Sequence, residues 1–365
     1  MIRLKAPGRI CLFGEHQDYL NYPVIAMAIS KYIYLEAEKI REKKFVILLP
    51  NINDTIEIQL KDVEIEYFSK RDYLRSGYNQ FIRKGFRFEN GYKIIITGDI
   101  PINAGAASSS SLVIAWLTFL NLISGNPFSK KEIADMGYLT EVAEFGEAGG
   151  KMDFFTSVYG DLIYLEPKGM APNVLEIPLK LEGFVLGDSL EKKQTVDDLK
   201  RVKTLSLQAF EYLKKIMPNF NEYESSLNDI EEFLPNLEIR YQKKIIGNII
   251  NRDLTKQALE LLNNYISSKF NNSHDSINFY TKMGSLLNKH QEQLKEKIEI
   301  TTPKIDKMID KCLEAGALGA KINGSGFGGT IFAISLGNQE SIKRSIEESG
   351  GKAYIIKTSN GVENY

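Results

Sequence analysis

The chain is poor in the residues that build disulfide frameworks and metal centres. Its 365 residues include two cysteines and three histidines. Cys11 and Cys312 are far apart and lie in apolar patterns, so we expect two buried thiols in a reducing compartment rather than a disulfide. His16 is separated from His274 and His290, which fall in a charged helical region. The histidines therefore predict no shared metal site.

The chain also lacks an excess of either charge and a long apolar run. It has 46 Lys and Arg against 47 Asp and Glu, a net charge of −1, with both signs interspersed. We therefore expect neither nucleic acid nor an anionic membrane as a partner. No segment approaches the ~20 apolar residues that cross a bilayer, and the first residues show no cleavage pattern. We expect a cytoplasmic protein.

Alternating strand and helix patterns indicate an α+β fold of two domains, the first over residues 1–178. The chain is 43% hydrophobic and 25% charged, which suits a well-buried globular protein. Short strands fill residues 2–66, and mixed strands with helices on one side are typical of this class. The other expected elements are helices at 73–84, 110–124 and 130–145 and strands at 92–97 and 161–166.

The second domain, residues 179–365, has the pattern of a split βαββαβ unit. A strand at 183–188 precedes a long helix-favouring region, 197–293, broken at Pro218 and Pro235. The remaining expected elements are a helix at 303–315, strands at 320–323 and 330–335, a helix at 339–348 and a strand at 353–357. The long helical region is thus an insertion after the first strand.

Residues 101–111 form a run of small residues, Pro-Ile-Asn-Ala-Gly-Ala-Ala-Ser-Ser-Ser-Ser, between an expected strand and an apolar helix. Small side chains let an anion approach the unpaired amides at a helix start, where the helix dipole also favours phosphate. Serine hydroxyls can cap the helix, contact phosphate or bind magnesium. Taken alone, the run fits an ordinary serine-capped helix equally well.

Two further segments concentrate polar side chains or glycine. Residues 14–19, Gly-Glu-His-Gln-Asp-Tyr, follow a strand, where α/β sites usually assemble, although a polar turn has the same pattern. Residues 319–330 form a glycine loop with a formal match to the dinucleotide-binding fingerprint. That motif needs a helix after it, whereas residues 331–335 read as a strand, so we reject a dinucleotide site.

With residues 149–154, Gly-Gly-Lys-Met-Asp-Phe, these segments resemble the motifs of the GHMP small-molecule kinases, and within them the galactokinases. Residues 14–19 are similar to the galactokinase sugar motif, and residues 101–111 to the ATP phosphate loop. Residues 321–329 are similar to the third family motif. The resemblance runs from Lys5 to about Asn360 and is weakest over 190–290. It implies an N-terminal mixed-sheet domain (ribosomal protein S5 domain 2-like), a ferredoxin-like C-terminal domain, and an active site between them.

The resemblance also implies roles for the polar residues. Asp153 would be the base, with Arg9 holding it ionised or stabilising charge during transfer. Ser109 and Glu141 would bind Mg²⁺, and Ser108 is the next candidate because the register within four serines is ambiguous. The expected ATP-binding residues are Gly105, Ala106, Ala107, Ser108, Ser109 and Ser110. Helix capping by the serines or Asp153, and a solvated helix face at Glu141, are the simpler alternatives.

Glu15, His16 and Asp18 would bind sugar hydroxyls, since carboxylates and an imidazole accept several hydrogen bonds at once. The chain departs from the galactokinase pattern mostly in substrate recognition. Leu199 stands where a tyrosine contacts the sugar, and Gln17 stands where threonine is usual. The other departures are Leu20–Tyr22 in place of an Asn-Gly-Gly-like turn, Phe154 in place of glutamine, and Ala106 and Ala107 in place of Leu and Ser.

The expected activity is ATP- and Mg²⁺-dependent phosphorylation of the anomeric hydroxyl of a monosaccharide, with galactose as the leading substrate. A kinase for N-acetylgalactosamine, galacturonate or arabinose is the alternative within the class. A catalytically inactive sugar sensor is the alternative outside it, although Arg9, Asp153 and the serine loop are all present. A mevalonate-type kinase is less expected, because residues 15–18 offer hydroxyl acceptors and no basic clamp. We expect a monomer.

Overall fold

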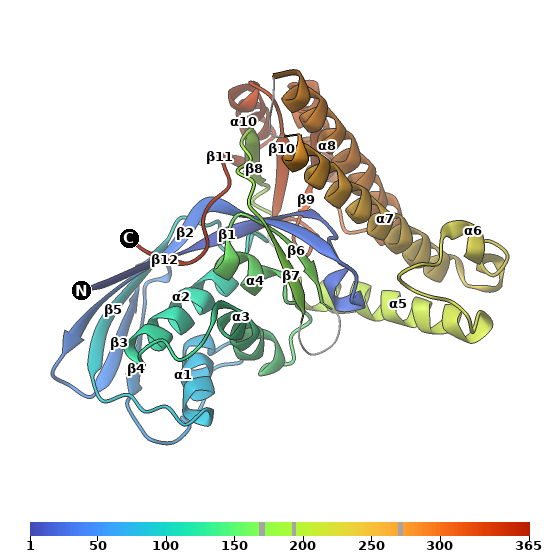
Figure 1. Cartoon of the computed structure of the whole chain (residues 1–365). Coiled ribbons are helices and arrows are strands. Elements are labelled where there is room, and N and C mark those ends of the chain that lie inside the picture. Colours follow the sequence, from blue (N-terminus) through green and yellow to red (C-terminus); the bar gives the residue numbers. More distant parts are fainter. Residues whose placement is uncertain (168–171, 192–194, 269–272) are drawn as a thin grey trace.

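The computed structural model describes residues 1–167, 172–191, 195–268 and 273–365 and contains two β-sheets with helices packed on them (Figure 1). The first sheet has eight strands and the second has four. Both sheets contribute to one buried apolar cluster, which includes Leu12 and Ile25 of the first and Phe332 of the second. The α+β class predicted from the sequence is confirmed.

The first sheet is mixed. Its main path runs β12-β1-β2-β5-β3-β4, and β6 and β7 extend it from β2. All pairings are antiparallel except β3 with β5. The strands are β1 (Ile2–Phe13), β2 (Val24–Ile40), β3 (Lys44–Leu49), β4 (Asp54–Gln59), β5 (Gly91–Gly98), β6 (Leu162–Glu166), β7 (Asn173–Ile177) and β12 (Glu363–Asn364).

Strands β1 and β2 are longer than the sequence predicted. The sequence predicted short strands over residues 2–66, but β1 and β2 are each continuous, and their pairing has register shifts near Pro7/Gly8 and Cys11/Phe13. At Gly8 an added Cβ would lie 2.7 Å from the carbonyl oxygen of Ala106. The missing side chain at Gly8 therefore lets the loop that contains Ala106 approach the sheet closely.

Four helices cover one face of the first sheet, as Figure 1 shows below the strands. They are α1 (Tyr73–Arg83), α2 (Ser108–Ile123), α3 (Lys130–Tyr138) and α4 (Met152–Tyr159). Helix α2 is central because its residues are apolar all round, and Trp116 is fully buried with its indole N–H bonded to the Leu74 carbonyl. After α3 the expected helix continues as a π-helical turn, Leu139–Ala143.

The second sheet has the order β11-β8-β10-β9, all antiparallel. Its strands are β8 (Phe184–Asp188), β9 (Gly319–Asn323), β10 (Thr330–Ile334) and β11 (Lys352–Ile356), with helices α9 (Pro303–Glu314) and α10 (Gln339–Glu348). This arrangement confirms the predicted βαββαβ pattern.

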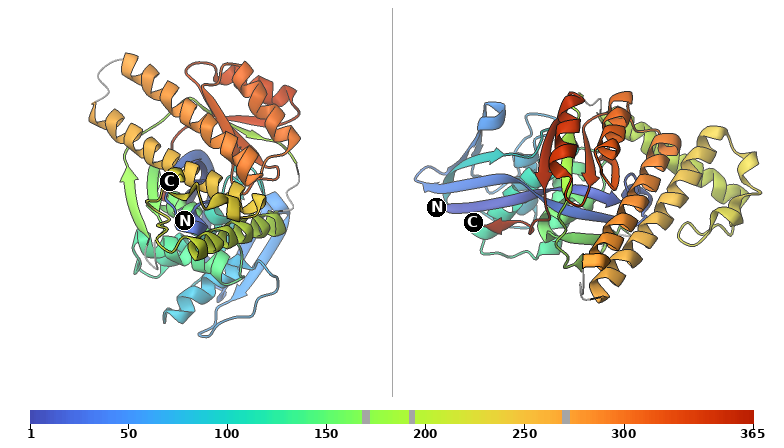
Figure 2. Two further views of the ribbon diagram at one scale, coloured as in Figure 1. Left: turned by 90° about the vertical axis from the view of Figure 1, so that its right-hand side faces the viewer. Right: turned by 90° about the horizontal axis from the view of Figure 1, so that it is seen from above.

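The insertion between β8 and α9 is helical, as expected. It comprises α5 (Thr195–Ile216), α6 (Leu227–Ile230), α7 (Ile239–Ser267), α8 (Ser273–Gln293) and a π-helical turn, Leu294–Ile298. Pro218 and Pro235 lie in the connections between α5, α6 and α7. Single 3₁₀ turns occur at Asp18–Leu20, Pro50–Ile52 and Leu234–Asn236. Figure 2 shows α7 and α8 side by side. None of the helices in the described ranges is long and apolar enough to cross a membrane.

The end of the chain returns to the first sheet. Thr358 bridges to Ile29, Asn360 bridges to Gly160, and β12 pairs with β1. Both termini consequently lie together in Figures 1 and 2. The domain boundary at residue 178 stays a prediction. The last residues of the predicted second domain pack on strands of the predicted first domain. Neither β7 nor the two-residue β12 was predicted.

Candidate active site

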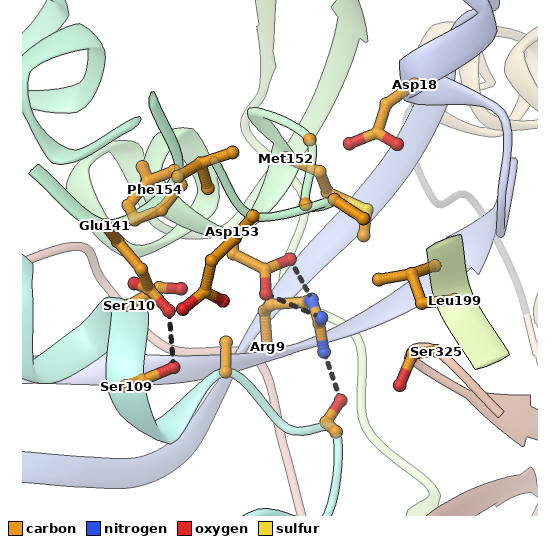
Figure 3. A pocket seen from close by; sticks show the side chains of 18 of the residues that line it. Arg9, Asp18, Ser109, Ser110, Glu141, Met152, Asp153, Phe154, Leu199 and Ser325 are labelled. Atoms are coloured by element: carbon orange, nitrogen blue, oxygen red, sulfur yellow. Dashed lines mark hydrogen bonds and ion pairs between the residues drawn. The ribbon is translucent and has the colours of Figure 1, made fainter. Parts of the chain in front are cut away.

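A cavity of about 420 Å³ collects residues from all four sequence motifs. Its wall includes Arg9 from β1 and most of the small-residue loop. The other motifs contribute Glu15, His16, Asp18 and Tyr19, residues 147–150 and 152–154, and Gly324 with Ser325. In Figure 3 the pair of Arg9 and Asp153 lies between Ser109 and Glu141 on one side and Asp18 and Leu199 on the other. The fold therefore brings the predicted site residues to one place.

Arg9 and Asp153 form a two-bond ion pair. The Arg9 Nε lies 2.7 Å from Asp153 Oδ1, and Nη2 lies 2.8 Å from Oδ2. Arg9 Nη1 also donates to the carbonyl of Gly105. Burial alone would lower the pKa of Arg9, but Asp153 and Glu15 together raise it. The Arg9 side chain is 5% exposed and that of Asp153 25%, so the carboxylate is held by the guanidinium and open to the cavity.

The small-residue loop turns sharply into α2. Gly105 and Ala107 have φ angles of 89° and 66°, and Ala107 precedes the helix without a capping side chain. The first amides of α2 thus lack a side-chain acceptor, which suits an anion. Of the six predicted ATP-binding residues, five line the cavity, whereas Ala106 is fully buried and its carbonyl accepts from the Arg9 amide at 3.1 Å.

Ser109 and Glu141, the two predicted metal ligands, meet at the cavity wall. Ser109 Oγ donates to Glu141 Oε1 at 2.7 Å. The π-helical turn carries Glu141 inward, where it is 7% exposed. Burial raises the pKa of Glu141 to about 7, and the hydrogen bond from Ser109 opposes that shift.

The donor set around Glu141 fits a hard cation. Its Oε2 is buried without a hydrogen-bond partner among the described residues. Among the residues that the structure describes, no group of three or more His, Cys, Asp or Glu side chains could hold a metal ion by itself. Mg²⁺ needs few protein ligands, because it keeps several waters and binds substrate phosphates. A hydroxyl and a carboxylate beside the loop therefore suit Mg²⁺ bound together with a nucleotide.

The three predicted sugar ligands differ in how far their polar atoms are already engaged. Glu15 Oε2 accepts from Lys321 Nζ at 2.7 Å, and Oε1 accepts from the Gly324 amide, also at 2.7 Å. His16 has a left-handed backbone, with Nε2 3.0 Å from the Ser325 carbonyl and Nδ1 3.1 Å from the Tyr19 hydroxyl. All three residues line the cavity, and sugar binding by each stays a prediction.

Asp18 is the most open of the three toward the cavity. It accepts from the amide of Tyr19 at 2.9 Å. Burial, and then the nearby charge of Asp153, raise the pKa of Asp18 to about 6. Gln17, by contrast, turns away from the cavity, and its Nε2 donates to the Asn248 carbonyl on α7 at 2.7 Å. The loop thus directs Glu15, His16, Asp18 and Tyr19 to the cavity and Gln17 to the helical insertion.

Arg71, Tyr73 and Glu147 also line the cavity and were not predicted. Tyr73 donates to Glu147 at 2.8 Å, and Arg71 Nε lies 2.9 Å from the same carboxylate oxygen. No motif marks Arg71 or Tyr73, since tertiary packing alone brings them to the wall. The sequence did contain a signal for Glu147, because this carboxylate lies shortly before the turn at Gly149. Leu199, at the start of α5, lines the cavity where the resemblance placed it.

Comparison with known proteins agrees with this geometry. Residues 72–161 match the GHMP kinases N terminal domain, residues 274–352 match GHMP kinases C terminal, and residues 2–39 match the galactokinase galactose-binding signature. The galactokinase of Thermotoga maritima is 28% identical, with 99% of each chain covered. The mevalonate kinase of Pyrococcus furiosus is 26% identical, with 97% of this chain and 95% of the relative covered.

Solved structures share the fold. Lactococcus lactis galactokinase complexed with galactose superposes with a TM-score of 0.84 at 21% identity, covering 100% of this chain and 95% of the other. Methanococcus jannaschii mevalonate kinase gives 0.70 at 19% identity, with 98% of each chain covered. The chain belongs to the GHMP kinase family and is a galactokinase-like enzyme that transfers a phosphoryl group to a hydroxyl.

Proposed function

We propose that the protein uses ATP and Mg²⁺ to phosphorylate the anomeric hydroxyl of a monosaccharide, with galactose as the expected substrate. The observation that carries this proposal is the Arg9–Asp153 pair, which faces a cavity between a phosphate-type loop and a loop of hydroxyl acceptors. The galactose-binding signature over residues 2–39 and the galactokinase relatives support the choice of sugar.

Asp153 is the proposed general base. As the anomeric oxygen attacks the γ-phosphorus of ATP, its proton passes to the Asp153 carboxylate. The bond from the γ-phosphorus to the bridging oxygen breaks, and ADP leaves with the electron pair. Arg9 holds both carboxylate oxygens and thereby fixes the direction in which the base faces. Positioning of this kind supplies much of the rate in phosphoryl transfer.

The small-residue loop is the proposed phosphate site. Free amides at the start of α2 would hold the β- and γ-phosphates, and the small side chains leave room for them. Ser109 and Glu141 would hold Mg²⁺, which when bound neutralises charge on the phosphates. The hydrogen bond between these two side chains favours Ser109 over Ser108 as the metal ligand.

The charge of the cavity wall favours a neutral, hydroxyl-rich acceptor. Among the described residues that line it, five are carboxylates and two are arginines: Glu15, Asp18, Glu141, Glu147 and Asp153, with Arg9 and Arg71. Both arginines are paired with a carboxylate of the same wall. A mevalonate or uronate carboxylate would therefore meet negative charge without an unpaired cation. This balance supports a neutral sugar over both acids.

An ADP-release assay with a panel of acceptors tests the proposal. The panel contains galactose, glucose, N-acetylgalactosamine, galacturonate, arabinose and mevalonate. If Asp18 reads the hydroxyl at C4, glucose should be poorer than galactose by about 1–3 kcal/mol, because one buried acceptor loses its partner. Preference for mevalonate would contradict the proposal. Sugar binding without turnover would instead support the inactive sensor.

A further inference from the structure

We propose that Lys203, on helix α5, is a positioning residue for sugar binding, because it supplies the positive charge that keeps the Asp18 carboxylate ionised and in place. Asp18 is taken here, as in the proposed function on which this step rests, to accept hydrogen bonds from the sugar. Helix α5 belongs to the insertion between β8 and α9. The insertion would thus contribute to substrate binding through a charge that lies outside the cavity.

The Asp18 carboxylate lies directly against the turn that precedes the proposed base. A Cβ atom added at Gly150 would overlap Asp18 Oδ2, so only glycine allows this contact. Asp153 follows Gly150 by three residues. Two carboxylates that share one cavity wall repel each other, which favours the neutral form of one of them. Asp18 therefore needs a positive charge of its own to stay ionised.

The arginines of the cavity wall are already engaged by other carboxylates. Arg9 binds both oxygens of Asp153, at 2.7 and 2.8 Å. Arg71 Nε lies 2.9 Å from the carboxylate of Glu147. A cation for Asp18 must therefore come from a side chain behind the wall.

Lys203 reaches Asp18 from behind two residues of the wall. Its Nζ lies 3.4 Å from the carbonyl oxygen of Ala148, two residues before Gly150, and 5.5 Å from the centre of the Tyr19 ring. Ala148 and Tyr19 both line the cavity. The Tyr19 amide donates to Asp18 at 2.9 Å. Lys203 thus contacts the two segments between which the Asp18 carboxylate is held.

The charges of Lys203 and Asp18 act on each other. Burial, and then Asp153, raise the pKa of Asp18, and the positive charge of Lys203 opposes them. Burial lowers the pKa of Lys203, and the charge of Asp18 opposes that shift. The other titratable groups of the same loop, Glu15 and His16, hydrogen-bond to different partners. Loss of the Lys203 charge should therefore make Asp18 easier to protonate.

The first test follows the titration of Asp18 directly and needs no sugar. Selective ¹³C labelling of aspartate carboxyl groups reports their protonation by NMR, and Asp18→Asn identifies the Asp18 signal. In Lys203→Met the titration midpoint should move up by about 1 pH unit, because the ionised form loses a nearby positive charge. Lys203→Arg keeps the charge and should leave the midpoint nearly unchanged.

The second test measures sugar affinity by calorimetry, with galactose or the best sugar of the panel. Omitting nucleotide and metal keeps the titration of Glu141 out of the measurement. The pKa of Asp18 is about 6, so wild-type affinity should fall as pH drops from 8 to 5. In Lys203→Met the fall should begin about 1 pH unit higher. The variant should then bind up to roughly fivefold more weakly than the wild type at pH 6 and nearly equally at pH 8.

Lys200→Met is the matched control. Lys200 lies on the same helix, three residues earlier, and is exposed. Its substitution removes an equal charge from a solvated position, so the Asp18 midpoint and the sugar affinity should stay at wild-type values. Melting temperatures show whether each variant is folded, and Lys203→Gln replaces Lys203→Met if the methionine variant does not fold.

Three results would overturn the inference. The first is an Asp18 midpoint that does not move in Lys203→Met. The second is an equal movement in Lys200→Met, which would reduce the effect to net charge. The third is a moved midpoint with no matching change in sugar affinity, which would remove Lys203 from sugar binding. If the wild-type chain binds and phosphorylates no sugar, the proposed function fails, and the NMR titration alone decides whether Lys203 keeps Asp18 ionised.

Discussion

The two ends of the cavity are built in different ways. The end proposed to bind phosphate, called the phosphate end, comes from consecutive residues at the start of α2, where small side chains and backbone amides face the cavity. The end proposed to bind sugar, called the sugar end, depends on side chains brought from distant parts of the chain, including Lys321 and Leu199. A backbone site tolerates many sequences, whereas a side-chain site changes its selectivity when one residue changes. The sugar end is therefore where this chain departs most from the galactokinase pattern.

The Arg9–Asp153 pair lies between the two ends, so its loss should have the largest effect. Asp153→Asn keeps the shape of the side chain and removes the proton acceptor. We expect kcat to fall roughly 10²–10⁴-fold while sugar affinity changes little. Single-turnover kinetics and sugar titration measure the two quantities. Near-normal kcat would show that transfer needs no base at this position.

At the sugar end, Asp18→Ala should act on sugar binding alone. One buried acceptor for hydroxyls is removed, so the sugar KM should rise roughly 10- to 100-fold while the ATP KM stays constant. Steady-state kinetics with each substrate varied in turn separates the effects. An equal rise in both constants would mean that the change disturbs the whole cavity, so that the two ends are not independent.

At the phosphate end, Ser109→Ala should weaken nucleotide binding in Mg²⁺ about tenfold and leave sugar binding intact, since a metal contact is lost. Ser108→Ala is the matched control, because the hydrogen bond to Glu141 comes from Ser109. Calorimetric titration of ADP with and without Mg²⁺ measures the difference. The larger loss in Ser108→Ala would shift the register by one residue.

The smallest expected effect is the pH dependence of metal binding. Burial raises the pKa of Glu141 to about 7, so below that pH a metal ion must displace its proton. Apparent Mg²⁺ affinity, measured with bound ADP, should fall by up to about tenfold in total as pH drops from 8 to 6. In Glu141→Gln only the titration of the nucleotide itself should remain. The same slope in both proteins would exclude Glu141 as a ligand.

Local sequence patterns predicted most of the fold, and they marked five of the residues from 105 to 110 that line the cavity. The alternation of apolar and polar residues and the helix-capping residues predicted nearly every strand and helix, because such signals lie within a few residues of one another. The sequence did not predict the short strands that pair with long ones. Strand β12 has only two residues and is defined by its pairing with β1. Likewise β7 is short and mostly exposed.

The sugar end shows what local patterns do not contain. Residues 15–18 read as a set of equivalent hydroxyl acceptors, yet Glu15 pairs with Lys321, whose position is 306 residues away. Gln17 turns to α7 because the helical insertion supplies a carbonyl there. Arg71 and Tyr73 reach the cavity through packing of α1. Contacts of this kind are set by the tertiary fold and leave no periodic signal in the sequence.

The most direct test of the central claim is the position of the phosphate in the product. Purified protein, Mg-ATP and galactose, or the best sugar of the panel, should give a product whose NMR spectrum shows phosphorus coupled to the anomeric proton. That result is predicted because Asp153 and Arg9 are proposed to activate the anomeric hydroxyl beside the phosphate loop. Phosphate on a primary hydroxyl would contradict the account.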